Sequence, residues 1–338
     1  RYHAFDGDHR RRRSTTERRR SCISVATTRA DDGARWCAVV RGGARWCAVV
    51  SELVHLLARP TVPSCSATRR GDDSLDFGPS VHCDMRLVSL CPSLTELLHD
   101  LGAADEVVGR TKFCVHPSPW VDGVEKIGGT KNPKVARIIA LAPDLVVMNE
   151  EENRLEDART LRDAGLTVHS SMPRTVADTA SMVRDIAAAI GRSDAGERIA
   201  GDIERRAERV RAAAQDAPPV SYAYLIWRDP WMSVSDDTFI SALLSLAGGR
   251  NVCGAATTRY PTITLDELCA AVPDVVFLSS EPFPFSSTHA QELAGALSID
   301  ADRVVLCDGE LLSWHGSRTP AGIDYAELLI AAQRSRIR

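Results

Sequence analysis

The chain has 338 residues, of which 44% are hydrophobic, 25% are charged and 5% are aromatic, and its formal net charge is −4. This composition is typical of a globular protein and excludes collagen-like, coiled-coil and wholly disordered chains. A membrane-spanning helix is not expected, because the most apolar stretch, residues 46–57, is shorter than the ~18 residues required and contains Glu52 and His55.

The first 84 residues differ from the rest in charge and pattern. They contain 15 arginines, no lysine and 10 acidic residues, and the octapeptide GARWCAVV occurs twice, at 33–40 and 43–50. Because no helical or alternating period is sustained, we expect residues 1–84 to be disordered or a spurious extension upstream of a translation start at Met85. A start at Met85 predicts a cytoplasmic protein, whereas an N-terminal segment lipidated at Cys65 predicts an exported or cell-surface lipoprotein.

After Met85, short apolar runs alternate with amphipathic stretches. The segment 93–96 (SLTE) fits a capping box, Asn132 followed by Pro133 fits a helix start, and Gly165 fits a helix end. We expect strands at 86–90, 107–109, 145–148 and 167–169, and helices beginning at 93, 132 and 154. Strands that alternate with helices are typical of a parallel sheet covered by helices.

The second half repeats this scheme and part of its sequence. We expect strands at 222–227, 252–253 and 275–278, and helices at 239–247 and from the capping box at 264–267. Residues 143–147 (PDLVV) correspond to 273–277 (PDVVF), and residues 107–109 (VVG) correspond to 252–254 (VCG), in the same order. Two ordered matches favour a duplicated α/β lobe.

The predicted fold class is therefore α/β, with two Rossmann-like parallel-sheet lobes joined by a single long helix. We expect an N-terminal lobe over 85–192, a connecting helix over 193–215 and a C-terminal lobe over 216–338. The connecting segment is rich in Ala, Arg and Glu, with charges at spacings of three and four that suit an exposed helix. A long helix is a stiff connector, so we expect the lobes to open and close little.

Ligands of open α/β sheets bind beyond the carboxyl ends of the strands, so the loops there are the candidate site. Eight aromatic residues fall in or beside these loops: Phe113, Trp120, Trp227, Trp231, Tyr260, Phe283, Phe285 and Trp314. Such rings bury a large area with few rotors to fix, which suits stacking on a large flat or apolar ligand. The alternative is that each ring closes the end of its own lobe's core.

Signatures of catalysis are weak. The sequence has no G-x-G-x-x-G after a strand, no P-loop, no G-x-S-x-G and no H-E-x-x-H. Cys114 and His116 alternate along an extended segment, so their side chains should point to opposite sides. The acidic run 150–152 could bind a cation, and His315 could ligate a metal inside a chelate or instead stack and hydrogen-bond beside Trp314.

Several segments together resemble the helical-backbone metal receptor superfamily. They are MRLVSLCPSLTELLHDLG (85–102), GGTKNP (128–133), LAPDLVVMNEEENRLEDARTLRDAGLTV (141–168), YLIWRDPWMSVSDDTFI (224–240) and LCDGELLSWHGSR (306–318). These receptors are the class III substrate-binding proteins of ABC importers, which carry vitamin B12, ferric siderophores or haem, and the likeness is strongest to the cobalamin-binding branch. It covers nearly all of 85–338 and none of 1–84.

The resemblance implies a non-catalytic protein that holds its ligand between the lobes. With the strand-end loops it gives these candidate ligand-binding residues: Pro92, Ser93, Phe113, His116, Asn149, Trp227, Trp231, Phe283, Phe285, Trp314, His315 and Arg318. The family docks onto its permease through surface glutamates, and Glu156 lies one residue from the first-lobe position. No intrinsic cofactor is expected, and the ligand would be cobalamin, haem or a ferric siderophore.

The implied partners are this small metal chelate and an ABC permease. We expect a monomer that binds no nucleic acid, because residues 85–338 hold 26 basic and 35 acidic residues. Two alternatives use the same cleft: a cytoplasmic enzyme that processes corrinoids or other tetrapyrroles, and a ligand sensor with a protein partner.

Overall fold

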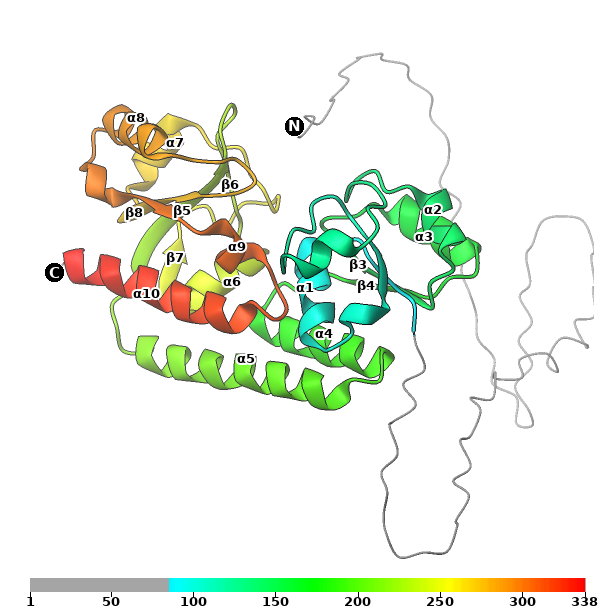
Figure 1. Cartoon of the computed structure of the whole chain (residues 1–338). Helices are drawn as coiled ribbons and strands as arrows, with labels where there is room; N and C mark the ends of the chain where they lie inside the picture. The colour runs from blue at the N-terminus through cyan, green and yellow to red at the C-terminus, as the bar shows by residue number, and fades with distance from the viewer. Residues whose placement is uncertain (1–84, 338) are drawn as a thin grey trace, which may run out of the picture. The chain divides into compact units, whose positions relative to one another are not determined.

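The computed structural model describes residues 85–337 (Figure 1). By their internal contacts the described residues form one compact unit, so both predicted lobes belong to it. The predictions made for residues 1–84 lie outside the described part. None of the helices within 85–337 combines the length and apolar character that crossing a bilayer requires.

The first sheet is fully parallel, in the order β2-β1-β3-β4. Its strands are β1 (Leu87–Ser89), β2 (Val107–Arg110), β3 (Leu145–Asn149) and β4 (Val168–Ser171). The central strands pair in register from Leu87 opposite Leu145 to Ser89 opposite Val147, and both strands are wholly buried. Continuous apolar runs form such strands because helices cover both faces of the sheet.

The first lobe contains α1 (Pro92–Asp100), α2 (Val135–Ala140), α3 (Leu155–Asp163) and α4 (Val176–Ala189), with the 3-10 turns η1 (Ala104–Glu106) and η2 (Trp120–Gly123). Two predicted helix starts were wrong. Pro92 occupies the first helical position of α1, so Ser93 lies inside the helix and is not its N-cap. Pro133 bridges Gly128 in an extended hairpin, which delays α2 until Val135.

The second sheet is mixed. Its strands are β5 (Val220–Trp227), β6 (Met232–Ser233), β7 (Gly249–Asn251), β8 (Val275–Ser279) and β9 (Val304–Cys307). Their order is β6-β5-β8-β9, and β7 also pairs with β5. Only β6 is antiparallel. The strand predicted at 252–253 was wrong, because the strand lies earlier, at residues 249–251 of β7, where it pairs with β5. Gly248 is in the left-handed conformation (φ 89°) and ends α6 just before β7 begins.

Five helices and one 3-10 turn complete the second lobe. They are α6 (Phe239–Leu246), α7 (Leu265–Ala271), α8 (Ser287–Leu297), α9 (Gly309–Ser313) and α10 (Thr319–Ile337), with η3 (Ala301–Arg303). The capping box predicted for α7 is confirmed, since Thr264 and Glu267 each accept the other's backbone N–H.

One interaction supports the inferred duplication. In the first lobe the Asp144 carboxylate, just before β3, accepts the backbone N–H of Arg86 at 2.8 Å. In the second lobe Asp274, just before β8, accepts the backbone N–H of Ser221 at 2.7 Å. The two matching Pro-Asp segments therefore anchor the same point of each sheet, and the strand orders β2-β1-β3-β4 and β7-β5-β8-β9 correspond.

Helix α5 (Ser193–Ala214) lies against α4 on one side and α10 on the other (Figure 1). Its buried Ile203 and Val210 belong to one apolar cluster that also contains Val147 of the first sheet and Phe277 of the second. This confirms the predicted fold class of two lobes joined by a long helix, apart from the antiparallel β6. We propose that α5 is the connecting helix and that the first lobe ends at α4.

Candidate functional site

The loops beyond the carboxyl ends of both sheets contact each other, and Arg318 is central to this contact. Its guanidinium donates to Glu96 of the first lobe at 2.6 Å and to Glu310 of the second, and it lies 4.5 Å from the Trp314 ring centre. From the first lobe, His116 Nε2 lies 3.7 Å from Glu310, and the His116 ring meets Trp314 edge-on at 5.8 Å. Three predicted site residues therefore meet at the lobe boundary.

Asn149 and His315 form a second link between the lobes. Asn149 Nδ2 donates to the Ser171 carbonyl at 3.1 Å and lies 3.2 Å from His315 Nε2. Because an amide nitrogen has two protons to donate, His315 Nε2 is the acceptor and the ring proton is on Nδ1. Asn149 Oδ1 accepts the backbone N–H groups of Glu151 and Glu152, which fixes the loop after β3.

Burial keeps the His315 imidazole neutral. Desolvation lowers its pKa from 6.5 to about 4, although nearby Glu151 opposes the shift. The unfolded chain takes up this proton at higher pH than the folded protein. The contribution of neutral His315 to the free energy of unfolding is therefore fully present above pH 6.5 and is lost as the pH falls toward 4.

When the pH is lowered from 7 to 5, we therefore expect the free energy of unfolding to fall by about 2 kcal/mol more in wild type than in His315→Gln. Urea unfolding at several pH values measures this difference. His99→Gln, a change at the half-buried end of α1, serves as the control. Parallel pH curves for wild type and His315→Gln would contradict a neutral buried imidazole.

A third link joins Glu151 to the loop that follows β7. Glu151 Oε1 accepts from Arg259 Nε at 3.2 Å and Nη2 at 3.0 Å, and from the Tyr260 hydroxyl. Arg259 Nη1 also donates to the backbone carbonyl and to the carboxylate of Asp237. The sequence indicated Tyr260 only as an aromatic residue, and Arg259 was missed. Its place in the loop between a strand and Pro261 was the signal that could have marked it as a site residue.

Glu281, two residues after β8, organises the second-lobe side of the boundary. Its Oε1 accepts from Ser313 Oγ at 2.7 Å and from the Trp314 indole N–H at 2.9 Å. Burial raises the pKa of Glu281, and these two hydrogen bonds only partly offset that effect. The same hydrogen bonds hold Trp314, which is 9% exposed.

Four of the other predicted aromatic residues pack on one another within the second lobe. Trp231 stacks on Phe285 at 5.9 Å with parallel planes, Trp227 meets Phe283 edge-on at 5.6 Å, and Phe283 lies 4.7 Å from Phe285. His289 packs against both phenylalanines. The core-closing alternative thus describes Phe285, which is buried, better than Trp227, which is only half-buried.

The first-lobe candidates differ in exposure. Pro92 is half-buried at the start of α1, and Ser93 is buried with its hydroxyl 3.4 Å from Cys91 Sγ. Phe113 is 39% exposed and lies under the Lys112 ammonium. The fully buried Arg110 shapes this loop, because its guanidinium donates to the Cys114 carbonyl at 2.7 Å.

Asn153 is a buried residue that sequence analysis missed. Its Nδ2 donates to the carbonyls of Leu90 at 2.9 Å and Thr130 at 3.0 Å, and its Oδ1 accepts the Asn149 N–H at 2.9 Å. It therefore ties three loops of the first lobe together. Glu156, the candidate docking residue, lies exposed in the first turn of α3.

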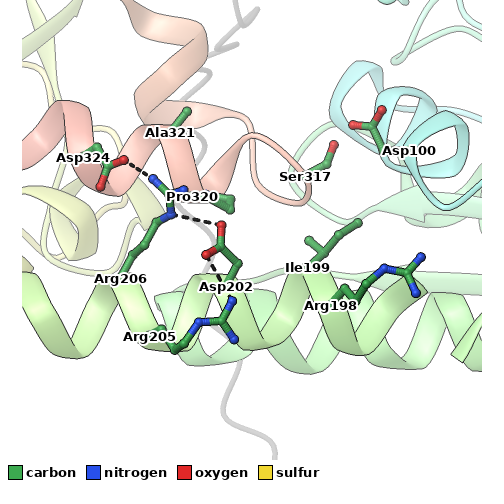
Figure 2. Close-up of a pocket in the computed structure, with 10 residues that line it drawn as sticks. All are labelled: Asp100, Arg198, Ile199, Asp202, Arg205, Arg206, Ser317, Pro320, Ala321 and Asp324. Carbon is green, nitrogen blue, oxygen red and sulfur yellow. Dashed lines mark hydrogen bonds and ion pairs between the residues drawn. The ribbon is translucent and has the colours of Figure 1, made fainter. Parts of the chain in front are cut away.

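A separate open groove of about 690 Å³ lies where α5 meets α10 and the end of α1 (Figure 2). Arg206 of α5 donates to Asp202 at 3.0 Å and to Asp324 of α10. The groove contains none of the predicted ligand residues. No three His, Cys, Asp or Glu side chains among residues 85–337 are placed to hold a metal ion.

Comparison with known proteins gives one family and a consistent fold. The sequence model of the family described as periplasmic binding protein matches residues 87–296. A vitamin B12-binding protein of Vibrio cholerae is 22% identical over 242 residues, which are 72% of this chain and 86% of that protein. A vitamin B12-binding protein of Photorhabdus laumondii is 22% identical over 195 residues, 58% of this chain and 70% of that protein.

Solved structures share the same arrangement. The periplasmic vitamin B12-binding protein of Vibrio cholerae superimposes with a TM-score of 0.65 at 21% identity, covering 74% of this chain and 98% of that one. The periplasmic haem-binding protein of Roseiflexus sp. RS-1 superimposes with a TM-score of 0.66 at 23% identity, covering 75% and 99%. At these identities the likeness concerns the fold, and the named ligands belong to those proteins.

Proposed function

Because the chain belongs to the periplasmic binding protein family, we propose that it holds a corrinoid or a haem-type or siderophore-type metal chelate between its lobes for an ABC import system. A substrate-binding role follows from the family. The choice of a metal chelate is supported by relatives named for vitamin B12 and haem.

The observation that carries the proposal is the meeting of strand-end loops from both sheets around Trp314. Its indole is fixed by Glu281, faced by Arg318 and touched by His116 from the other lobe. A ring held by packing and hydrogen bonds from several segments loses little freedom when a flat ligand stacks on it. We propose that this boundary is one wall of the site and that Trp227, Trp231 and Phe283 form another, with the buried Phe285 packed against Trp231.

The remaining candidates complete this proposal. We propose that the buried pair Asn149 and His315 also contributes to the site, with Phe113, Pro92 and Ser93 on the first-lobe side. We propose that Glu156, exposed on α3, contributes to docking on a permease. Its carboxylate has no salt bridge among the described residues and is therefore available to a partner arginine.

Equilibrium dialysis of the protein against cyanocobalamin, haemin and a ferric siderophore, read by absorption, tests the proposal. We expect one of the three to be retained at micromolar concentration and recovered unchanged. Retention of none would contradict the proposed ligand class. Conversion of the bound chelate into a new species would contradict a non-catalytic role and favour a processing enzyme.

A further inference from the structure

The loop that follows β2 begins and ends at the same point of the first lobe. The Arg110 N–H donates to the Glu125 carbonyl at 2.9 Å, and the Arg110 carbonyl accepts the N–H of Ile127 at 2.9 Å. Residues 111–124, which lie between these contacts, form a closed loop that we call the His116 loop. Compact loops with neighbouring ends are packed from within by side chains and often carry function.

The side chain of Arg110 reaches both halves of this loop. It is 1% exposed, and its Nη1 donates to the carbonyls of Cys114 at 2.7 Å and Thr111 at 3.3 Å in the first half. Its Nη2 lies 4.0 Å from the Asp122 carboxylate in the second half. One buried guanidinium is therefore common to the two halves of the loop.

The contacts of this guanidinium do not satisfy it. Arg110 Nε and Nη2 are buried and have no hydrogen-bond acceptor within residues 85–337. The Asp122 carboxylate lies beyond hydrogen-bonding distance, and its side chain is 68% exposed, so water screens it. A buried, incompletely paired charge is destabilising, and an apolar side chain of similar volume is often at least as stable. Stability alone does not explain an arginine at this position.

The loop that Arg110 holds carries His116 to the second lobe. Cys114, whose carbonyl accepts from Arg110, lies two residues before His116, and its thiol accepts from Thr95 Oγ1 at 3.0 Å. The ring of His116 then meets that of Trp314 edge-on at 5.8 Å. Because Cys114 is held at both its backbone and its side chain, it fixes the start of the segment that leads to this contact.

Resting on the proposed function for the role of His116, we infer that Arg110 is a positioning residue for the ligand site. Its guanidinium holds the His116 loop so that His116 lies against Trp314 before a ligand arrives. Order that is present before binding does not have to be created by the ligand, and this raises the affinity. The buried charge lowers stability and is kept because it places the loop.

Arg110→Met, which keeps a long side chain and removes its charge and donors, tests the inference in the ligand-free protein. Histidine-selective NMR follows the ring-proton resonance of His116, which the ring current of Trp314 displaces and which His116→Gln identifies by its absence. In Arg110→Met we expect this resonance to move toward its position in Trp314→Ala, where the ring current is missing. An arginine that served only stability would not move it.

Affinity and stability give two further readouts of the same variant. We expect Arg110→Met to bind the retained chelate about tenfold more weakly, because the ligand must then order the loop and its side chains. The urea midpoint should equal or exceed that of wild type, because an incompletely paired buried charge has been removed. Affinity is thus expected to fall without a loss of stability.

Arg86→Met is the matched control. Arg86 also donates to a backbone carbonyl of the first lobe, that of Leu141, from Nε at 3.0 Å and from Nη2 at 2.9 Å. It is exposed and lies outside the His116 loop. This substitution should leave the His116 resonance and the chelate affinity at their wild-type values.

The inference and the proposed function fail in different ways. A wild-type His116 resonance in Arg110→Met would overturn the inference, and so would a variant that does not fold, because the arginine would then serve stability. A displaced resonance with undiminished affinity would also overturn it, because the position of the loop would not matter for binding. Failure of wild type to retain any chelate would overturn the proposed function, whereas the resonance would still report whether Arg110 positions the loop.

Discussion

Replacing Asn153 with alanine is expected to lower the free energy of unfolding by about 2–4 kcal/mol, because three buried backbone groups lose their partner at once. These are the carbonyls of Leu90 and Thr130 and the N–H of Asn149. Asn153 is 6% exposed, and all three partner residues are buried, so water cannot easily replace the lost hydrogen bonds. Urea denaturation measures the change.

Asn132→Ala is the matched control, since that asparagine is exposed in the loop 128–133. It should change stability by less than about 0.5 kcal/mol. Asn153→Asp keeps the acceptor but replaces the amide donor with a carboxylate, which faces two carbonyl oxygens. It should therefore be at least as destabilising as alanine. Wild-type stability of Asn153→Ala would mean that Asn153 does not hold these loops.

Replacing Trp314 with alanine is expected to weaken binding of the retained chelate by about 1–3 kcal/mol, a loss of about fivefold to more than a hundredfold in affinity. The substitution removes the ring, its hydrogen bond to the Glu281 carboxylate and its contact with the Arg318 guanidinium. Equilibrium dialysis is the suitable measurement, because the variant also changes the tryptophan fluorescence.

Trp314→Phe separates the two contributions, since phenylalanine retains a ring but not the N–H donated to Glu281. We expect its affinity to lie between those of wild type and Trp314→Ala. Trp120→Phe serves as the control, because the Trp120 ring packs on His99 in the first lobe. Undiminished binding by Trp314→Ala would remove Trp314 from the proposed site.

The fold could be predicted because its signals are local. The Pro-Asp segments, the apolar strand runs and the Ala-rich helix each depend on a few neighbouring residues, and their repetition indicates two corresponding sheets. Capping boxes were less reliable, because spacing alone does not distinguish the true box at Thr264 from the false one at Ser93. The neighbouring Pro92 decides the second case, since its fixed φ suits the first position of a helix.

The candidate site could be predicted only in part, because its partners are distant in sequence. Asn149, His116, Trp314 and Arg318, all expected in or beside strand-end loops, do make contacts between the two lobes, and their role in ligand binding stays a prediction. Nothing local indicates that Arg318 pairs with Glu96, 222 residues away, or that Arg259 pairs with Glu151. The rings of Phe283 and Phe285 resemble a stacking surface in sequence, but neighbouring rings can also satisfy each other, and only three-dimensional packing decides between these outcomes.

Within residues 85–337 the backbone passes from one lobe to the other once, through α5 and the exposed segment 215–219 that precedes β5. Helix α5 is held to both neighbours without that covalent link, by Arg184 to Glu197 and Glu204 on the α4 side and by Arg209 to Glu327 on the α10 side. A cut at 215–219 would therefore leave two fragments with complementary surfaces. We expect that the gene can be split at this point into separately encoded halves that reassemble.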